Sequence, residues 1–181
     1  MPGRWPAWVP GRRSAVDARS APAFTARWVA PPYPRSVTVT VEVASEATPE
    51  LVEAFGRLLP QLSRSAAALD ADALARILKH DANTVFVARA ADGTIVGTLT
   101  LVMVPIPTGL RARIEDVVVD EAARGQGVGT ALTQAAIDAA RQAGARTLDL
   151  TSRPDRDAAG RLYERMGFRQ RDSRLYRYAG E

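Results

Sequence analysis

In the first part of the chain, hydrophobic residues recur first at every second position and then at the spacing of a helix. Residues 37–43, Val-Thr-Val-Thr-Val-Glu-Val, alternate strictly and predict a strand with one buried face. The apolar positions that follow recur at helical spacing, which predicts a helix that Thr48 caps and Pro49 begins. These positions are Leu51, Val52, Phe55, Leu58 and Leu59. A second, short helix is predicted after Asp70 or Asp72.

The middle and end of the chain predict more strands, separated by helices. Strands are expected at residues 84–88, 94–104, 111–119 and 146–151, with a long helix before the last of them. A final helix is predicted at residues 158–166, and one or two strands at residues 168–178. The strand-helix-strand unit requires a parallel crossover, whereas short turns make the other neighbouring strands antiparallel. We therefore expect an α/β fold (in the wider sense, α+β), with a mixed sheet of about six or seven strands flanked by about four helices.

Positive charge is concentrated in the first 36 residues. This segment has six arginines and one aspartate, while the rest of the chain has 18 basic and 19 acidic residues. It also holds seven of the 12 prolines and has no helical or strand periodicity. We predict a disordered Arg/Pro-rich extension at residues 1–36, with a transit segment or a start-site artefact as alternatives, and a single domain at residues 37–181. The near-neutral domain does not predict a nucleic-acid partner.

The composition excludes several kinds of chemistry. The chain has no cysteine and a single histidine, His80, which rules out thiolate catalysis and any site with several such metal ligands. We expect no bound metal. Because no apolar run reaches 18 residues, we also expect no membrane span. We expect a cytoplasmic location. The excess of arginine over the single lysine is typical of bacterial genes of high G+C content.

A glycine-rich loop follows the predicted strand at residues 111–119. Residues 124–130 read Arg-Gly-Gln-Gly-Val-Gly-Thr, and an apolar helical pattern begins directly afterwards. Glycine lets the backbone approach a ligand, and free N–H groups at a helix start attract anions, so the loop predicts a pyrophosphate site. A Walker loop is excluded because the only lysine is Lys79. A dinucleotide fingerprint is disfavoured because Thr130 occupies its third small position.

Two motifs resemble one known family. The pattern Arg-x-x-Gly-x-Gly at residues 124–129, after a valine strand, resembles the acetyl-CoA-binding segment of the GNAT superfamily of N-acetyltransferases. Residues 157–168, Asp-Ala-Ala-Gly-Arg-Leu-Tyr-Glu-Arg-Met-Gly-Phe, resemble the A-x-x-L-Y-x-x-x-G-F segment of the same superfamily. The resemblance extends from Val37 to Tyr178, about four fifths of the chain, and implies the GNAT fold.

The resemblance also implies a cofactor site for acetyl-CoA as the co-substrate. In this family the strand before the glycine loop bulges away from its neighbour, and the pantetheine arm lies in the gap. The backbone of Val117, Val118 and Val119 would hold that arm. The pyrophosphate would lie on Arg124, Gly125, Gln126, Gly127, Val128, Gly129 and Thr130. Many relatives have an asparagine after the next strand; residues 152–156 contain none, and Arg156 is the candidate in its place.

Acetyl transfer to an amine needs a proton acceptor and a proton donor. An alkyl amine is almost fully protonated near neutral pH, so a carboxylate would help to remove its proton. Strict alternation places Glu115 on the face of Val117 and Val119, and Asp116 on the opposite face, although a bulge would exchange them. We predict Glu115 as the base, with Asp116 or a water chain as alternatives. By resemblance, Tyr163 is the general acid that protonates the leaving thiolate.

The resemblance implies an acceptor that is a primary amine of a small molecule or a peptide. The hexapeptide Ile-Glu-Asp-Val-Val-Val at residues 114–119 looks like the matching strand of glucosamine-phosphate N-acetyltransferases, which suggests an amino-sugar phosphate as a narrower alternative. A non-catalytic acyl-CoA-binding regulatory domain would also keep the glycine loop. A homodimer is common in the family, and we expect that one is possible here. A nucleic-acid-associated role for the Arg-rich start is disfavoured.

Overall fold

A computed structural model describes residues 26–28, 39–63 and 65–178 of the chain. Its strands are β1 (Ala26–Trp28), β2 (Val39–Val43), β3 (Asn83–Arg89), β4 (Ile95–Ile106), β5 (Gly109–Val119) and β6 (Leu148–Leu150). Its helices are α1 (Pro49–Leu62), α2 (Ala71–Lys79), α3 (Val128–Gln142) and α4 (Asp157–Arg165), with a short 3-10 helix, η1 (Glu121–Ala123), before α3. Apart from β1 and η1, each element lies where the sequence predicts one, and residues 37 and 38 of the first predicted strand lie outside the described residues.

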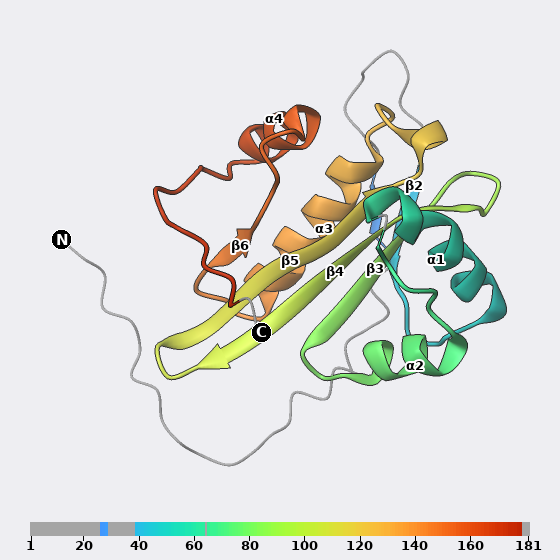
Figure 1. The fold of residues 1–181 in the computed structure, drawn as a ribbon, viewed down its shortest axis with the longest axis horizontal. Coiled ribbons are helices and arrows are strands. Elements are labelled where there is room, and N and C mark those ends of the chain that lie inside the picture. The colour runs from blue at the N-terminus through green and yellow to red at the C-terminus, as the bar shows by residue number, and fades with distance from the viewer. Residues whose placement is uncertain (1–25, 29–38, 64, 179–181) are drawn as a thin grey trace.

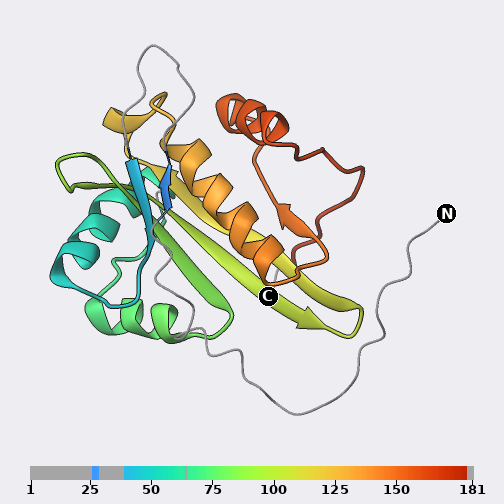
Figure 2. The ribbon, with the colours of Figure 1, turned by 180° about the vertical axis from the view of Figure 1, so that it is seen from behind.

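The strands form one mixed sheet. Within the described residues its order is β1-β2-β3-β4-β5-β6. Neighbouring strands from β1 to β5 are antiparallel, and β6 is parallel to β5 after the crossover through α3. Helices α1 and α2 cover one face of the sheet (Figure 1), and α3 covers the other (Figure 2). The predicted fold class is confirmed.

Two apolar clusters fill the layers on either side of the sheet. One joins α1 and α2 to the sheet, with Leu58 and Leu74 fully buried. The other joins α3 to the opposite face, with Leu132 and Ala136 fully buried. Among the helices of the described ranges, none is both long and apolar enough to cross a membrane.

The predicted capping residues begin the first two helices. The Thr48 hydroxyl accepts a hydrogen bond from the N–H of Leu51 at 3.2 Å at the start of α1. The Asp70 carboxylate accepts a hydrogen bond from the N–H of Ala73 at 2.7 Å at the start of α2. Each cap satisfies a backbone donor that has no partner inside the helix. Of the two predicted starts of α2, the structure therefore selects Asp70 over Asp72.

Strand β1 lies inside the segment that the sequence predicts to be disordered. It pairs with β2 in antiparallel register, with Ala26 opposite Val41 and Trp28 opposite Val39. The prediction of disorder across residues 1–36 is corrected for these three residues, because β2 offers them an unpaired edge. The rest of the extension lies outside the described residues, so its predicted disorder stays a prediction.

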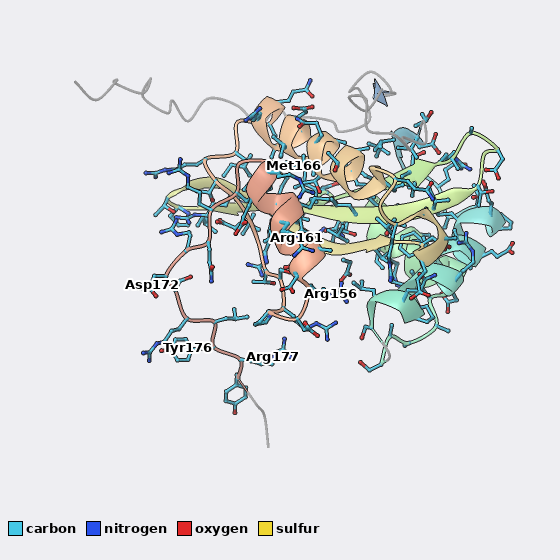
Figure 3. The ribbon with its side chains drawn as sticks, turned by 90° about the horizontal axis from the view of Figure 1, so that it is seen from above. Arg156, Arg161, Met166, Asp172, Tyr176 and Arg177 are labelled. Atoms are coloured by element: carbon cyan, nitrogen blue, oxygen red, sulfur yellow. The ribbon has the colours of Figure 1, made fainter. Side chains whose placement is uncertain are left out.

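The strands predicted at residues 168–178 are wrong, because the structure has no strand there. The side chains of Leu175 and Tyr176 are 74% and 82% exposed. Figure 3 shows Tyr176 and Arg177 directed away from the sheet, on the side opposite α3. The segment carries charge at every second or third position, and three-residue β6 offers little edge to pair with. It therefore has no apolar face that a sheet could bury.

The last two strands of the sheet separate along their length. Strand β6 pairs with β5 only at residues 112–114. Beyond that point β5 continues to Val119, whereas the chain leaves β6 after Leu150 and turns toward α4. The two strands therefore diverge toward the end of β5 that leads into the glycine loop (Figure 1). This divergence is the main feature that positions the candidate site.

Candidate active site

An extra residue forms a bulge in β5 opposite β4. Thr98 pairs with Val118 but Thr100 pairs with Glu115, so β4 advances by two residues while β5 advances by three. Asp116 has a φ of +49°, in the left-handed region that residues other than glycine rarely adopt. A bulge leaves its extra residue unpaired in the ladder and changes the direction of nearby side chains.

The bulge reverses which β5 side chains face α3. Before it, Ile114 packs on the α3 side; after it, Val117 and Val119 pack there, and Val118 packs with α1 and α2. Glu115 therefore lies on the α1 and α2 side of the sheet, as Val118 does. The placement from strict alternation, with Glu115 on the face of Val117 and Val119, is wrong, because the inserted residue shifts the period of two by one position.

The glycine loop ends in a helix start that has no side-chain cap. Gly127 occupies the capping position of α3 with a φ of +87°, and Gly125 has a φ of +74°. The first hydrogen bond of the helix runs from the Ala131 N–H to the Gly127 carbonyl at 3.0 Å. The preceding N–H groups, those of Val128, Gly129 and Thr130, therefore have no partner within the helix. Such groups, at the positive end of the helix dipole, attract an anion.

Gly129 has a packing role. A methyl group at this position would lie 3.2 Å from Cδ1 of Leu162 in α4 and 3.8 Å from Cγ2 of Val119. The first turn of α3 thus lies directly under α4 and beside the end of β5. The small residue brings the helix start, the strand end and α4 together.

Arg124 and Gln126 hold the loop by hydrogen bonds to its backbone. Arg124 donates from Nε to the Val119 carbonyl at 3.3 Å, and its Nη1 lies 3.3 Å from a Glu121 carboxylate oxygen. Gln126 donates from Nε2 to the Ala122 carbonyl at 2.8 Å. The Arg124 side chain stays exposed at the mouth of the loop, where its remaining N–H groups can reach an anion.

Tyr163 lies half-buried in α4, where its ring meets that of Phe168 edge to face with centroids 5.8 Å apart. Burial raises the pKa of the Tyr163 hydroxyl, and the positive charge of Arg156 opposes part of that rise. The hydroxyl is therefore a proton donor at neutral pH. Arg156, just before α4, donates from Nη2 to the Leu62 carbonyl at 3.1 Å, which ties α4 to the end of α1 (Figure 3).

The two carboxylates at the bulge differ in their surroundings. Glu115 forms a close ion pair with Arg113, which also donates to the Thr151 hydroxyl at 3.3 Å. Asp116 is exposed to solvent, yet partial desolvation of its carboxyl raises the pKa, and the negative charge of Glu115 adds to the rise. The structure therefore brings both predicted base candidates to the bulge on adjacent residues.

The end of α1 is tied to the turn that leads into the glycine loop. Arg57 forms an ion pair with Asp120 and donates to the Ile95 carbonyl at 2.9 Å. The Gln61 side-chain oxygen accepts a hydrogen bond from the Glu121 N–H at 2.9 Å. Sequence analysis missed these contacts, because the pattern of a surface helix does not reveal a partner so far along the chain.

An open hollow lies beside the turn that joins β5 to the glycine loop, between the β3–β4 hairpin and the start of α3. It is lined by the Arg57–Asp120 pair, the hairpin residues and the side chains of Gln126 and Val128. It does not include the divergence of β5 and β6. In the part of the chain that the structure describes, no three histidine or acidic side chains gather in a way that could hold a metal ion.

Comparison with known proteins gives the family. Residues 45–168 match the model of the acetyltransferase (GNAT) family. This chain belongs to the GNAT family. The match spans more than half of the chain and includes both the glycine loop and Tyr163. The family places the chain among the acetyltransferases and confirms the resemblance that the two sequence motifs carry.

Individual GNAT proteins are similar to this chain over part of its length. The chain is 44% identical over 71 residues to the N-alpha-acetyltransferase 30 of Schizosaccharomyces pombe, covering 39% of this chain and 47% of that protein. The chain thus matches about half the length of that relative. A proposed acetyltransferase of Agrobacterium tumefaciens is 29% identical with a TM-score of 0.68, covering 77% of this chain and 99% of that one. A transcriptional regulator of Bacillus halodurans is 31% identical with a TM-score of 0.63, covering 78% and 99%.

Proposed function

We propose that this chain is an acetyl-CoA-dependent N-acetyltransferase that moves an acetyl group directly from the thioester to a primary amine of a small molecule or peptide. The observation that carries the proposal is the position of the bulge. It lies between the divergence of β6 from β5 and the glycine-capped start of α3. A thioester carried between the strands would therefore lie beside both carboxylates.

The proposed cofactor site uses backbone groups more than side chains. The amides of pantetheine pair with the backbone of residues 117–119, where β6 no longer pairs with β5. The pyrophosphate lies on the N–H groups at the start of α3, with the charge of Arg124 beside it. The full proposed set is Val117, Val118, Val119, Arg124, Gly125, Gln126, Gly127, Val128, Gly129, Thr130 and Arg156. Arg156 is the weakest member, because its guanidinium already binds the end of α1.

The proposed reaction has one proton acceptor and one proton donor. A carboxylate at the bulge takes a proton from the ammonium of the acceptor, so the nitrogen lone pair can attack the thioester carbonyl. A backbone N–H at the bulge stabilises the oxyanion that forms. The C–N bond is then complete, the C–S bond breaks, and the Tyr163 hydroxyl gives its proton to the leaving sulfur. The attacking nitrogen loses its second proton as the intermediate collapses, and that proton restores the Tyr163 hydroxyl through solvent. Glu115 stays the proposed base, and Asp116 is the second candidate on the adjacent residue.

The acceptor is the least constrained part of the proposal. The name of the fission-yeast relative supports an α-amine of a peptide or protein. The carboxylates of Glu115 and Asp116 suit any cationic amine, so the amino-sugar-phosphate alternative stays open. The name of the Bacillus relative favours a second candidate, an acyl-CoA-binding regulatory domain that performs no transfer. A homodimer, like the domain limits at residues 37–181, stays a prediction.

Amine-dependent release of free thiol from acetyl-CoA tests the proposal. The full chain would be incubated with acetyl-CoA and, in separate reactions, peptides with free N-termini, amino sugars, amino-sugar phosphates and polyamines. We expect thiol release with at least one amine class, matched by an acetylated product in the mass spectrum. Tight binding of acetyl-CoA with no product from any amine would favour the regulatory domain.

A further inference from the structure

Two buried polar atoms have no hydrogen-bond partner at the end of β5 that is far from the glycine loop. Within the described ranges, the buried side-chain atoms without a partner are Nε of Arg111 and Oγ1 of Thr147. A buried donor without a partner costs stability, so two in one place need an explanation. The mechanism proposed above uses neither residue.

Arg111 lies in β5 and Thr147 directly precedes β6, and their side chains lie on the same side of the sheet. The N–H of Ala112 donates to the Thr147 carbonyl at 2.8 Å, and Ala112 pairs with Leu148 in the next position of the ladder. Ala112 and Leu148 pack toward α3. Arg111 and Thr147 each come one residue before this pair, and the Ala112–Thr147 hydrogen bond continues the ladder, so the two side chains face the other side. Figure 1 shows no helix in front of this end of β5.

A second arginine comes to the same turn. Arg111 donates from Nη2 to the Thr108 hydroxyl at 3.3 Å, and Arg146 donates from Nη1 to the Thr108 carbonyl at 3.0 Å. In the described part of the chain, neither guanidinium has a carboxylate within ion-pair distance. Arg57 and Arg113, by contrast, each have one. Two arginines without a carboxylate partner thus both bind Thr108, and the unsatisfied atoms belong to one of them, Arg111, and to Thr147.

We propose that Arg111, Arg146 and Thr147 bind an oxyanion, either a carboxylate or a phosphate group. A guanidinium presents parallel N–H groups that match the oxygens of such an anion, and a hydroxyl adds one more donor. At about 3.3 Å per residue, the site lies roughly 15 Å along β5 from the bulge. The anion is either a free small ligand or a group carried by an acceptor whose amine lies at the bulge. The second source rests on the proposed function.

The first experiment uses inorganic phosphate as the probe and does not depend on acetyl transfer. Thermal unfolding of the full chain is followed against phosphate, with sodium chloride adjusted to keep ionic strength constant. The variants are Arg111→Met and Thr147→Val, with Arg141→Gln, an exposed arginine at the end of α3, as the charge-matched control. We expect phosphate to raise the Tm of the wild type and of Arg141→Gln, and at least a tenfold weaker apparent affinity in Arg111→Met.

Thr147→Val gives a second readout that a purely structural role would not produce. The substitution keeps the side-chain volume and removes the unsatisfied hydroxyl. We expect a higher Tm without phosphate together with a weaker response to phosphate. The proposal is overturned if phosphate leaves the wild-type Tm unchanged at constant ionic strength, or if Arg111→Met responds as strongly as the wild type.

A second experiment separates the two sources of the anion. Two peptides with the same first residue carry Glu or Gln at the fifth position, which an extended chain places about 15 Å from the amine. A lower KM for the Glu peptide that disappears in Arg111→Met would assign the anion to the acceptor. Equal KM values with phosphate binding intact would assign a free ligand. If neither peptide is acetylated, that result counts against the peptide acceptor, and phosphate binding alone decides the oxyanion site.

Discussion

Glu115 and Val117 are two residues apart in β5, yet they lie on opposite faces of the sheet. The extra residue at Asp116 shifts the alternation between them. Val117 therefore helps to close the α3 side, while Glu115 is held by Arg113 on the side of α1 and α2. One backbone feature thus separates the apolar side of the proposed cofactor site from the charged side, where we propose that the amine approaches.

Substitution of each bulge carboxylate should identify the base. Glu115→Gln removes the proposed proton acceptor and is expected to lower kcat/KM by about 100-fold or more, the usual contribution of a general base. Asp116→Asn should lower it less than about tenfold by the same measure. Steady-state kinetics on both variants checks the assignment. A large loss in Asp116→Asn with a small loss in Glu115→Gln would give the role to Asp116.

Asp116 should also make the stability of the protein depend on pH. Because the pKa of Asp116 is raised in the folded protein, folding favours its protonated form. Its carboxylate therefore destabilises the protein above the folded pKa, and this penalty disappears as the pH falls through the raised pKa toward the ordinary value. Asn also tolerates the left-handed φ. We expect Asp116→Asn to raise the Tm at pH 7 but not at pH 3. An equal shift at both values would show that charge is not the cause.

Tyr163→Phe tests the proposed proton donor without removing the ring. The edge-to-face contact with Phe168 is retained, so the Tm should change little. We expect kcat to fall by about 100-fold if the hydroxyl protonates the leaving thiolate. Because burial raises the pKa of Tyr163, the wild-type rate should show no basic limb from this group below pH 10. Tyr176→Phe, at an exposed position, is the control and should retain full activity.

Gly97 in β4 allows the end of β5 and the start of α3 to pack closely against it. A methyl group there would lie 3.0 Å from the Val118 carbonyl oxygen and 3.1 Å from Cγ1 of Val128. Since one of these contacts is backbone, Gly97→Ala should destabilise the protein by about 1–3 kcal/mol and displace the start of α3. Gly56→Ala in α1, where nothing lies within 4 Å, should instead stabilise by up to about 1 kcal/mol. Chemical denaturation of both variants checks the contrast.

The sequence predicts most of the fold because its periods are regular. The helical spacing after Thr48 and the alternation at residues 37–43 each indicate a single kind of element. The structure confirms the helix and, over the described residues 39–43, the strand. The sequence does not predict the bulge. Three successive apolar residues, Val117, Val118 and Val119, can be buried on either face of the sheet, so their pattern does not show a shift in the alternation. The strands predicted at residues 168–178 are wrong because the segment has no continuous apolar face, and three-residue β6 offers little edge to pair with. Contacts such as Arg57–Asp120 depend on the assembled fold.

Binding of acetyl-CoA to matched glycine variants tests the central claim most directly. Gly127 in the loop and Gly93 in the β3–β4 turn have φ values of +87° and +88°, so a glutamate costs similar backbone strain at either position. At about 100 times Kd, acetyl-CoA should stabilise the wild type by about 2.7 kcal/mol, a Tm rise of about 5–11 °C. The account predicts the same rise in Gly93→Glu and none in a folded Gly127→Glu. An unchanged rise in Gly127→Glu, or no rise in the wild type, would contradict it.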